Sequence, residues 1–229
     1  VSSDGGNPGG GGGQEGGQRS CCPSPLAMEQ NAANLARYAS ICQANGLVPI
    51  VEPEVLMDGS HGIQEAAAAT EKVLACVFKH LSDHHVMLEG IILKPNMVRP
   101  GQACAAGLQA NASQIALATV RVLQHVVPCS VPGVTFLSGG MTEEEASLAL
   151  NAINQLDTVK PWSLSFSFGR ALQQSCLQAW KGDPANTAAA QAQLLKRCVA
   201  NSEAQRGEYA GGVQGAASST DLAQKNYVY

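Results

Sequence analysis

Apolar residues along the chain alternate between a helical spacing and short continuous runs. From Pro25 to Asn45 they recur close to a helical period, which predicts a helix, and Gly46 is a favourable residue to end it. Leu47 to Val51 then forms a short apolar run that predicts a buried strand. The same alternation continues to about residue 201. It predicts further strands at 90–93, 134–137 and 163–167 and further helices at 64–81, 111–125, 142–156, 169–180 and 187–201.

The order of these segments predicts an α/β fold. Short apolar strands separated by helices of ten or more residues are typical of βα units with a parallel sheet. Each predicted strand is followed by polar residues, at 52–54, 94–96, 138–140 and 167–170. In a TIM (β/α)8 barrel the carboxyl ends of the strands face a common active site. The pattern therefore predicts four βα units, half of such a barrel, with candidate site residues at the strand ends.

Composition narrows the class of protein. The chain has 229 residues, 45% of them hydrophobic and 14% charged, which is enough apolar material for one substantial core. The net charge of −4 and the lack of a basic cluster argue against a nucleic-acid partner. Apolar runs such as 90–93 are far shorter than the roughly 20 residues of a membrane-spanning helix. We therefore expect no membrane partner either.

The amino-terminal segment differs from the rest of the chain. Residues 1–22 are rich in glycine, a composition that buries little apolar surface, so we expect a disordered or artefactual leader. Because the chain opens on Val1, we also expect a truncated sequence. The eight cysteines contain no CxxC pair, and no apolar secretory segment comes before them. This favours reduced thiols and a cytoplasmic location, with a plastid location left open.

Four ordered segments carry a specific resemblance. LARYASICQANGLVPIVEPEVL, LEGIILKPNMV, GVTFLSGGMTEEEA and PWSLSFSFGRALQ closely resemble the class I fructose-bisphosphate aldolases of animals and plants, and the similarity extends from about residue 23 to Tyr229. The resemblance implies that residues 23–205 form strands five to eight of a TIM barrel. It also implies that residues 206–229 form a mobile tail whose Tyr229 acts in the active site, that the enzyme is a homotetramer and that it needs no cofactor.

Lys94, Glu52 and Glu54 are the candidate catalytic residues. Lys94 ends an apolar strand, where a partly desolvated amine is nucleophilic, although most strand-end lysines are solvated. Glu52 and Glu54 are two residues apart, so in a strand they share a face, although solvated loop carboxylates are the simpler interpretation. The resemblance implies that Lys94 forms a Schiff base with the substrate. It further implies that Glu52 is a general acid and base and that Glu54 supports the lysine electrostatically.

A phosphate site is predicted at the last two strand ends. The turn 138–140 precedes a helix that Thr142 and Glu145 would cap, so its backbone N–H groups can bind an anion, although a glycine pair can be a simple turn. The resemblance makes this the site of the substrate's C1 phosphate, formed by Ser138, Gly139, Gly140, Ser167, Gly169 and Arg170. The five histidines lack the spacing of a metal set, and class I chemistry needs no metal, so we expect none.

Two functions remain open from the sequence. The first is reversible cleavage of fructose 1,6-bisphosphate to dihydroxyacetone phosphate and glyceraldehyde 3-phosphate in glycolysis and gluconeogenesis. The sequence does not distinguish a preference for this substrate from a preference for fructose 1-phosphate. The second is a catalytically incomplete aldolase fragment or a non-enzymatic scaffold. In either case we expect this chain alone to be incomplete as an enzyme, because four strands do not close a barrel.

Overall fold

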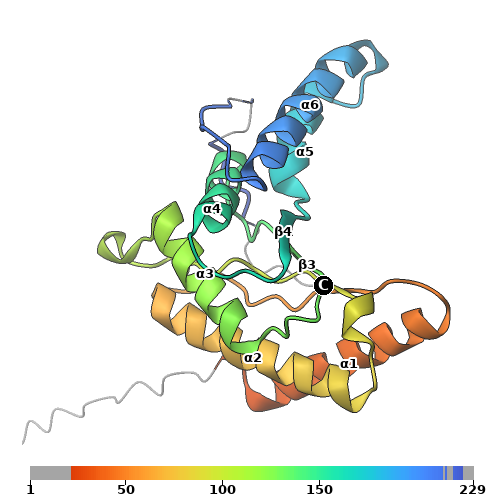
Figure 1. Ribbon diagram of the computed structural model, residues 1–229. Helices are drawn as coiled ribbons and strands as arrows, with labels where there is room; N and C mark the ends of the chain where they lie inside the picture. The colour runs from red at the N-terminus through yellow and green to blue at the C-terminus, as the bar shows by residue number, and fades with distance from the viewer. Residues whose placement is uncertain (1–21, 214, 216–218, 224–229) are drawn as a thin grey trace, which may run out of the picture.

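The computed structural model describes residues 22–213, 215 and 219–223 and contains four successive βα units (Figure 1). Its strands are β1 (Ile50–Val51), β2 (Ile92–Leu93), β3 (Gly133–Phe136) and β4 (Ser163–Phe166). Its α-helices are α1 (Pro25–Ala44), α2 (Ile63–Asp83), α3 (Ala112–Val126), α4 (Glu143–Gln155), α5 (Arg170–Trp180) and α6 (Thr187–Ala204). Three short 3₁₀ helices, η1 (Leu88–Gly90), η2 (Ala106–Leu108) and η3 (Pro184–Asn186), lie in the connections.

The predicted helices are confirmed, with ends that the sequence signals place well. Ser24 caps α1, whose first residue is Pro25, and Gly46 follows this helix with a φ of +72°. Thr142 and Glu145 form the expected capping box at the start of α4. The strands β1 and β2 are shorter than predicted, at two residues each. The 3₁₀ helices are not evident from the apolar pattern.

The four strands form one parallel sheet in which each strand pairs with its neighbour in the chain, in the order β1-β2-β3-β4. Val51 pairs with Leu93, Leu93 with Val134, and Val134 with Leu164, and all four are buried in the core. Side chains alternate between the two faces of a strand. The residues just after β1 and β2, Glu52 and Lys94, therefore belong to the opposite row from these core residues.

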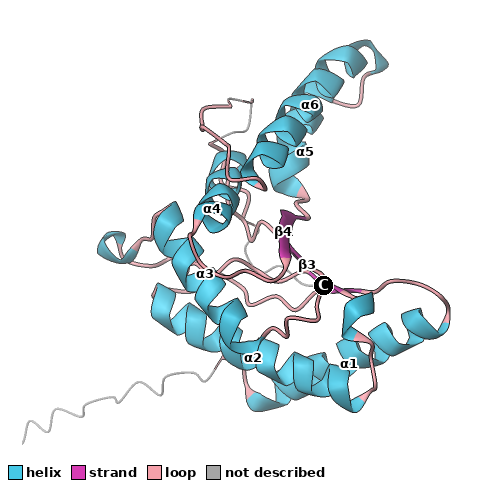
Figure 2. Ribbon diagram, viewed as in Figure 1, coloured by secondary structure: helices cyan, strands magenta, loops and turns pink. Residues whose placement is uncertain are grey.

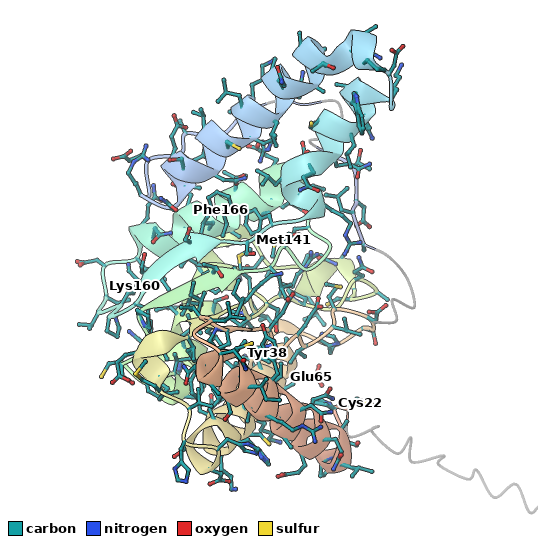
Figure 3. The ribbon with its side chains drawn as sticks, turned by 90° about the vertical axis from the view of Figure 1, so that its right-hand side faces the viewer. Cys22, Tyr38, Glu65, Met141, Lys160 and Phe166 are labelled. Atoms are coloured by element: carbon teal, nitrogen blue, oxygen red, sulfur yellow. The ribbon has the colours of Figure 1, made fainter. Side chains whose placement is uncertain are left out.

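The helices pack against one another in an arc around the sheet (Figures 1 and 2). α1 contacts α2, α2 contacts α3, α3 contacts α4, and α4 contacts both helices of the α5–α6 pair. Figure 3 shows Met141 and Phe166 in the middle of the molecule, between this pair and α1, where Tyr38 is labelled. None of the described helices is long and apolar enough to cross a membrane.

The edge of the sheet at β1 is covered by little protein. Tyr38, Leu47, Val48 and Ile50 lie near this strand in sequence or space and remain 45%, 61%, 62% and 45% exposed. Within the described residues β1 pairs only with β2, and β4 pairs only with β3. Unpaired edge strands and exposed apolar side chains promote association with other chains.

Candidate active site

Residues from the carboxyl ends of all four strands surround one cavity of about 200 Å³. The nine predicted site residues that the structure describes all line it: Glu52, Glu54, Lys94, Ser138, Gly139, Gly140, Ser167, Gly169 and Arg170. The tenth, Tyr229, lies outside the described residues. In the described part of the chain the four strand ends therefore converge on one cavity, and the roles of the residues that line it stay a prediction.

Lys94 and Glu52 form the central contact of the cavity. The backbone N–H of Lys94 donates to the carbonyl of Val51 at 2.7 Å, which continues the parallel ladder and sets Lys94 beside Glu52. The lysine Nζ lies 2.8 Å from Glu52 Oε1, and the side chains are 20% and 38% exposed. A carboxylate at hydrogen-bond distance from an amine is in place to exchange a proton with it or with a group bound to it.

Glu54 reaches the cavity from a loop. β1 ends at Val51 and Pro53 follows, so the prediction that Glu52 and Glu54 share one strand face is wrong, because the strand is too short. The loop is fixed by the buried Asn96, whose Oδ1 accepts from the N–H of Val55 at 2.9 Å. The two carboxylates still line the same cavity.

The turn after β3 needs both of its glycines. Gly139 and Gly140 have φ angles of +53° and +74°, and the N–H of Met141 donates to the carbonyl of Ser138 at 3.1 Å. Side chains are strained in this region of backbone conformation. A Cβ on Gly140 would also lie 3.0 Å from the Cα of Ala223. The turn therefore brings the backbone close to the cavity, as an anion site requires.

The amino terminus of α5 lies at the cavity and has no acidic residue in its first turn, unlike that of α4. The first turn of α4 contains Glu143, Glu144 and Glu145, which already offset the positive end of its dipole. α5 has no acidic residue in its first turn, Gly169 is its N-cap, and Arg170 is its first residue. We expected the Thr142-capped helix, α4, to attract an anion. The structure favours α5 for this role, because the positive end of its dipole and the Arg170 guanidinium both attract an anion.

A buried ionic cluster holds α5 in place. Glu143 is fully buried, and its carboxylate accepts from the backbone N–H of Ser175 at 2.9 Å and from the Ser175 hydroxyl at 2.6 Å. Arg197 of α6, 1% exposed, donates to the Glu143 carbonyl and to Ser147 Oγ, each at 2.6 Å. The cluster joins α4, α5 and α6 behind Arg170. The sequence did not reveal it, because three consecutive glutamates resemble a solvated helix start.

The described part of the tail folds back along α4 to the cavity. Tyr209, 4% exposed, donates its hydroxyl to Glu144 at 2.7 Å, and burial followed by this hydrogen bond raises the pKa of the phenol. Farther along, the carbonyl of Leu222 accepts from Arg170, and Ala223 lines the cavity. Five lining residues were not predicted: Leu56, Met57, Asp58, Leu137 and Ala223. Only Asp58 is charged, and it lies four residues after Glu54 in the sequence.

Comparison with known proteins matches this chain to one family. The sequence profile of the family described as "Glycolytic: Fructose-bisphosphate aldolase class-I" matches residues 18–229. Cytosolic fructose-bisphosphate aldolase 5 of Arabidopsis thaliana is 58% identical, and fructose-bisphosphate aldolase B of Homo sapiens is 56% identical. These matches cover 90% and 91% of this chain but only 57% of each relative, so the chain spans little more than half their length.

A solved structure is also similar. The fructose-bisphosphate aldolase of Plasmodium falciparum, crystallised with TRAP and a small-molecule inhibitor, superimposes with a TM-score of 0.80 and 53% identity. The superposition covers 83% of this chain and 54% of that one. The four-stranded parallel sheet is thus part of a TIM barrel. By fold, by the arrangement of its strand ends and by sequence, the chain belongs to the class I fructose-bisphosphate aldolase family.

Proposed function

We propose that this chain carries the Schiff-base residues of an enzyme that reversibly cleaves fructose 1,6-bisphosphate to dihydroxyacetone phosphate and glyceraldehyde 3-phosphate. The observation that carries the proposal is the Lys94–Glu52 contact of 2.8 Å in a cavity that Arg170 and the glycine turn also line. An amine nucleophile, a proton carrier and an anion site are the groups that this reaction needs.

In the proposed mechanism the neutral amine of Lys94 attacks the C2 carbonyl of the sugar. Glu52 protonates the hydroxyl of the resulting carbinolamine, which leaves as water, and an iminium forms between Lys94 and C2. Glu52, now a carboxylate, takes the proton of the C4 hydroxyl as the C3–C4 bond breaks. The electron pair of that bond passes to the iminium to give an enamine, and glyceraldehyde 3-phosphate leaves. Protonation of the enamine at C3 and hydrolysis of the iminium then release dihydroxyacetone phosphate and regenerate Lys94.

The remaining residues hold the substrate or adjust the lysine. Ser138, Gly139, Gly140, Ser167 and Gly169 provide polar and backbone groups for the C1 phosphate, and Arg170 adds a charge-assisted contact. Glu54, on the same cavity, supports the protonated states of Lys94 electrostatically. We assign to Tyr229 the role of a mobile tail residue that enters the site.

The setting of the enzyme is part of the proposal. Two of the similar relatives are named cytosolic, and we place this protein in the cytosol as well. We also propose a homotetramer, which the family resemblance implies and a sedimentation measurement on the completed barrel tests.

Covalent trapping tests the function. The chain is fused behind the first four βα units of a relative, dihydroxyacetone phosphate is added, and the imine is reduced with borohydride. Peptide mapping should place the label on Lys94, and Lys94→Met should remove it. Lys160, outside the cavity, serves as the matched control through Lys160→Met, which should leave the label in place. Label on another lysine with Lys94 unmodified would reject the assignment, and no label at all would favour the non-enzymatic scaffold.

A further inference from the structure

A second cluster of chemically capable side chains lies between α1 and α2, away from the cavity. Glu29 comes from α1, and Cys76 and His80 come from α2, where a spacing of four residues puts them on one face. The His80 Nε2 lies 2.7 Å from one Glu29 oxygen, and the Cys76 Sγ lies 3.8 Å from the other. One potential ligand atom from each of the three residues lies within 4.8 Å of those of the other two. None of the three lines the active-site cavity.

Thiolate, imidazole and carboxylate together are a ligand set for zinc. Zinc bonds of about 2.3 Å to sulfur and about 2.0–2.2 Å to nitrogen and oxygen put tetrahedral ligand atoms about 3.3–3.6 Å apart. The Cys76–Glu29 distance is slightly longer than this range and the His80–Glu29 distance is shorter. Glu29 is 58% exposed, so a rotation of its side chain can open the shorter contact.

The sulfur atom distinguishes this cluster from an ordinary ion pair. His125 and Glu71 make a similar contact of 3.0 Å between α3 and α2, with side chains 47% and 44% exposed. In the pair with Glu29, His80 is only 15% exposed, and the Cys76 thiol, which is in no disulfide, supplies a third potential ligand. Lys79, the cation next to the cluster in sequence, already pairs with Asp83 at 2.6 Å.

We propose that Glu29, Cys76 and His80 bind one Zn²⁺ ion, with water as the fourth ligand, and that this ion links α1 to α2. On binding, the zinc–sulfur bond forms as the Cys76 S–H bond breaks and the proton passes to solvent. The site is independent of the aldolase reaction. The spacing of residues in the sequence did not predict this metal site, because Glu29 is about fifty residues away from Cys76 and His80. Because the ligands converge only in the folded state, the ion stabilises the folded chain increasingly as its free concentration rises above the dissociation constant.

Cobalt serves as the spectroscopic probe for zinc in the full chain, reduced and free of metal. Co²⁺ should bind with a stoichiometry of one and give a thiolate-to-cobalt charge-transfer band together with the intense visible bands of tetrahedral cobalt, and Zn²⁺ should displace it. Cys76→Ser should abolish the charge-transfer band. Glu29→Gln and His80→Gln should each weaken binding by at least about tenfold to a hundredfold, the range known for changes even outside the ligand shell.

The control variants are His125→Gln, which removes the comparable pair, and Cys129→Ser, which removes an exposed thiol. Both should bind cobalt as the unchanged chain does. A measurement without substitutions guards against misfolding: Zn²⁺ should slow alkylation of Cys76, mapped by mass spectrometry, and leave Cys129 unprotected. The proposal is overturned if the unchanged chain shows no charge-transfer band, if the band survives Cys76→Ser, or if Cys129 is protected as strongly as Cys76.

Discussion

Replacing Arg170 with alanine tests the proposed phosphate site most directly. Arg170 lines the cavity at the first residue of α5, where its charge adds to the positive end of the helix dipole. A hydrogen bond to a charged group contributes about 1.5–3 kcal/mol. At about 1.4 kcal/mol for each factor of ten, Arg170→Ala should lower kcat/KM for fructose 1,6-bisphosphate about 10- to 150-fold in the completed barrel.

Arg170 has a second role that the assay must separate. Its guanidinium also donates to the carbonyl of Leu222, so the substitution removes a contact to the tail as well. Loss of the phosphate contact should weaken binding of dihydroxyacetone phosphate and leave that of unphosphorylated dihydroxyacetone unchanged. Loss of the tail contact should affect both ligands equally.

The matched control is Arg206→Ala, which removes the same charge from an exposed pair with Glu208 outside the cavity. This variant should keep the kcat/KM of the parent. An unchanged kcat/KM in Arg170→Ala, or an equal loss of affinity for the two ligands, would refute the role of Arg170 in phosphate binding.

Three further predictions concern the chain itself. The 229-residue chain alone should have little aldolase activity, because β1 and β4 each have an unpaired edge among the described residues. Fusion behind the first four βα units of a relative should restore the activity. Full activity of the chain alone would contradict this prediction. Arg197→Met should lower the free energy of unfolding in urea by about 3–5 kcal/mol, because it leaves the charge of the buried Glu143 without its cationic partner. The control Arg206→Met should change the free energy of unfolding little. An equally small loss in Arg197→Met would show that the cluster is not stabilising. Tyr209→Phe should cost about 0.5–1.5 kcal/mol at neutral pH. Because the folded pKa of Tyr209 lies above its ordinary value of 10.0, the stability it contributes is present below that pH and is lost as the pH rises through the folded pKa, so the variant should show a shallower alkaline decline.

Local features of the sequence predicted the fold and most of the candidate site. The helix ends follow from residues next to them in the chain, such as Ser24, Gly46 and the Thr142–Glu145 box. The convergence of the strand ends follows from topology, because parallel strands joined in sequence present their carboxyl ends to one side. Topology and the family resemblance together picked out nine described candidate residues that line one cavity, and their roles stay a prediction.

Contacts between distant segments could not be predicted in the same way. The length of β1, the choice of α5 over α4 as the helix terminus at the cavity, and the burial of Glu143 against Ser175 and Arg197 all depend on how elements pack in three dimensions.

The sequence by itself thus determined where the helices and strands lie and which residues follow each strand, because side-chain alternation and helix caps are local properties of the chain. Only the tertiary structure decided which of them touch, as Lys94 touches Glu52 and as Glu29 meets Cys76 and His80. The reason is physical: packing of apolar faces sets the distances between elements to fractions of an ångström, and proton transfer, ion pairing and metal binding depend on distance at that scale.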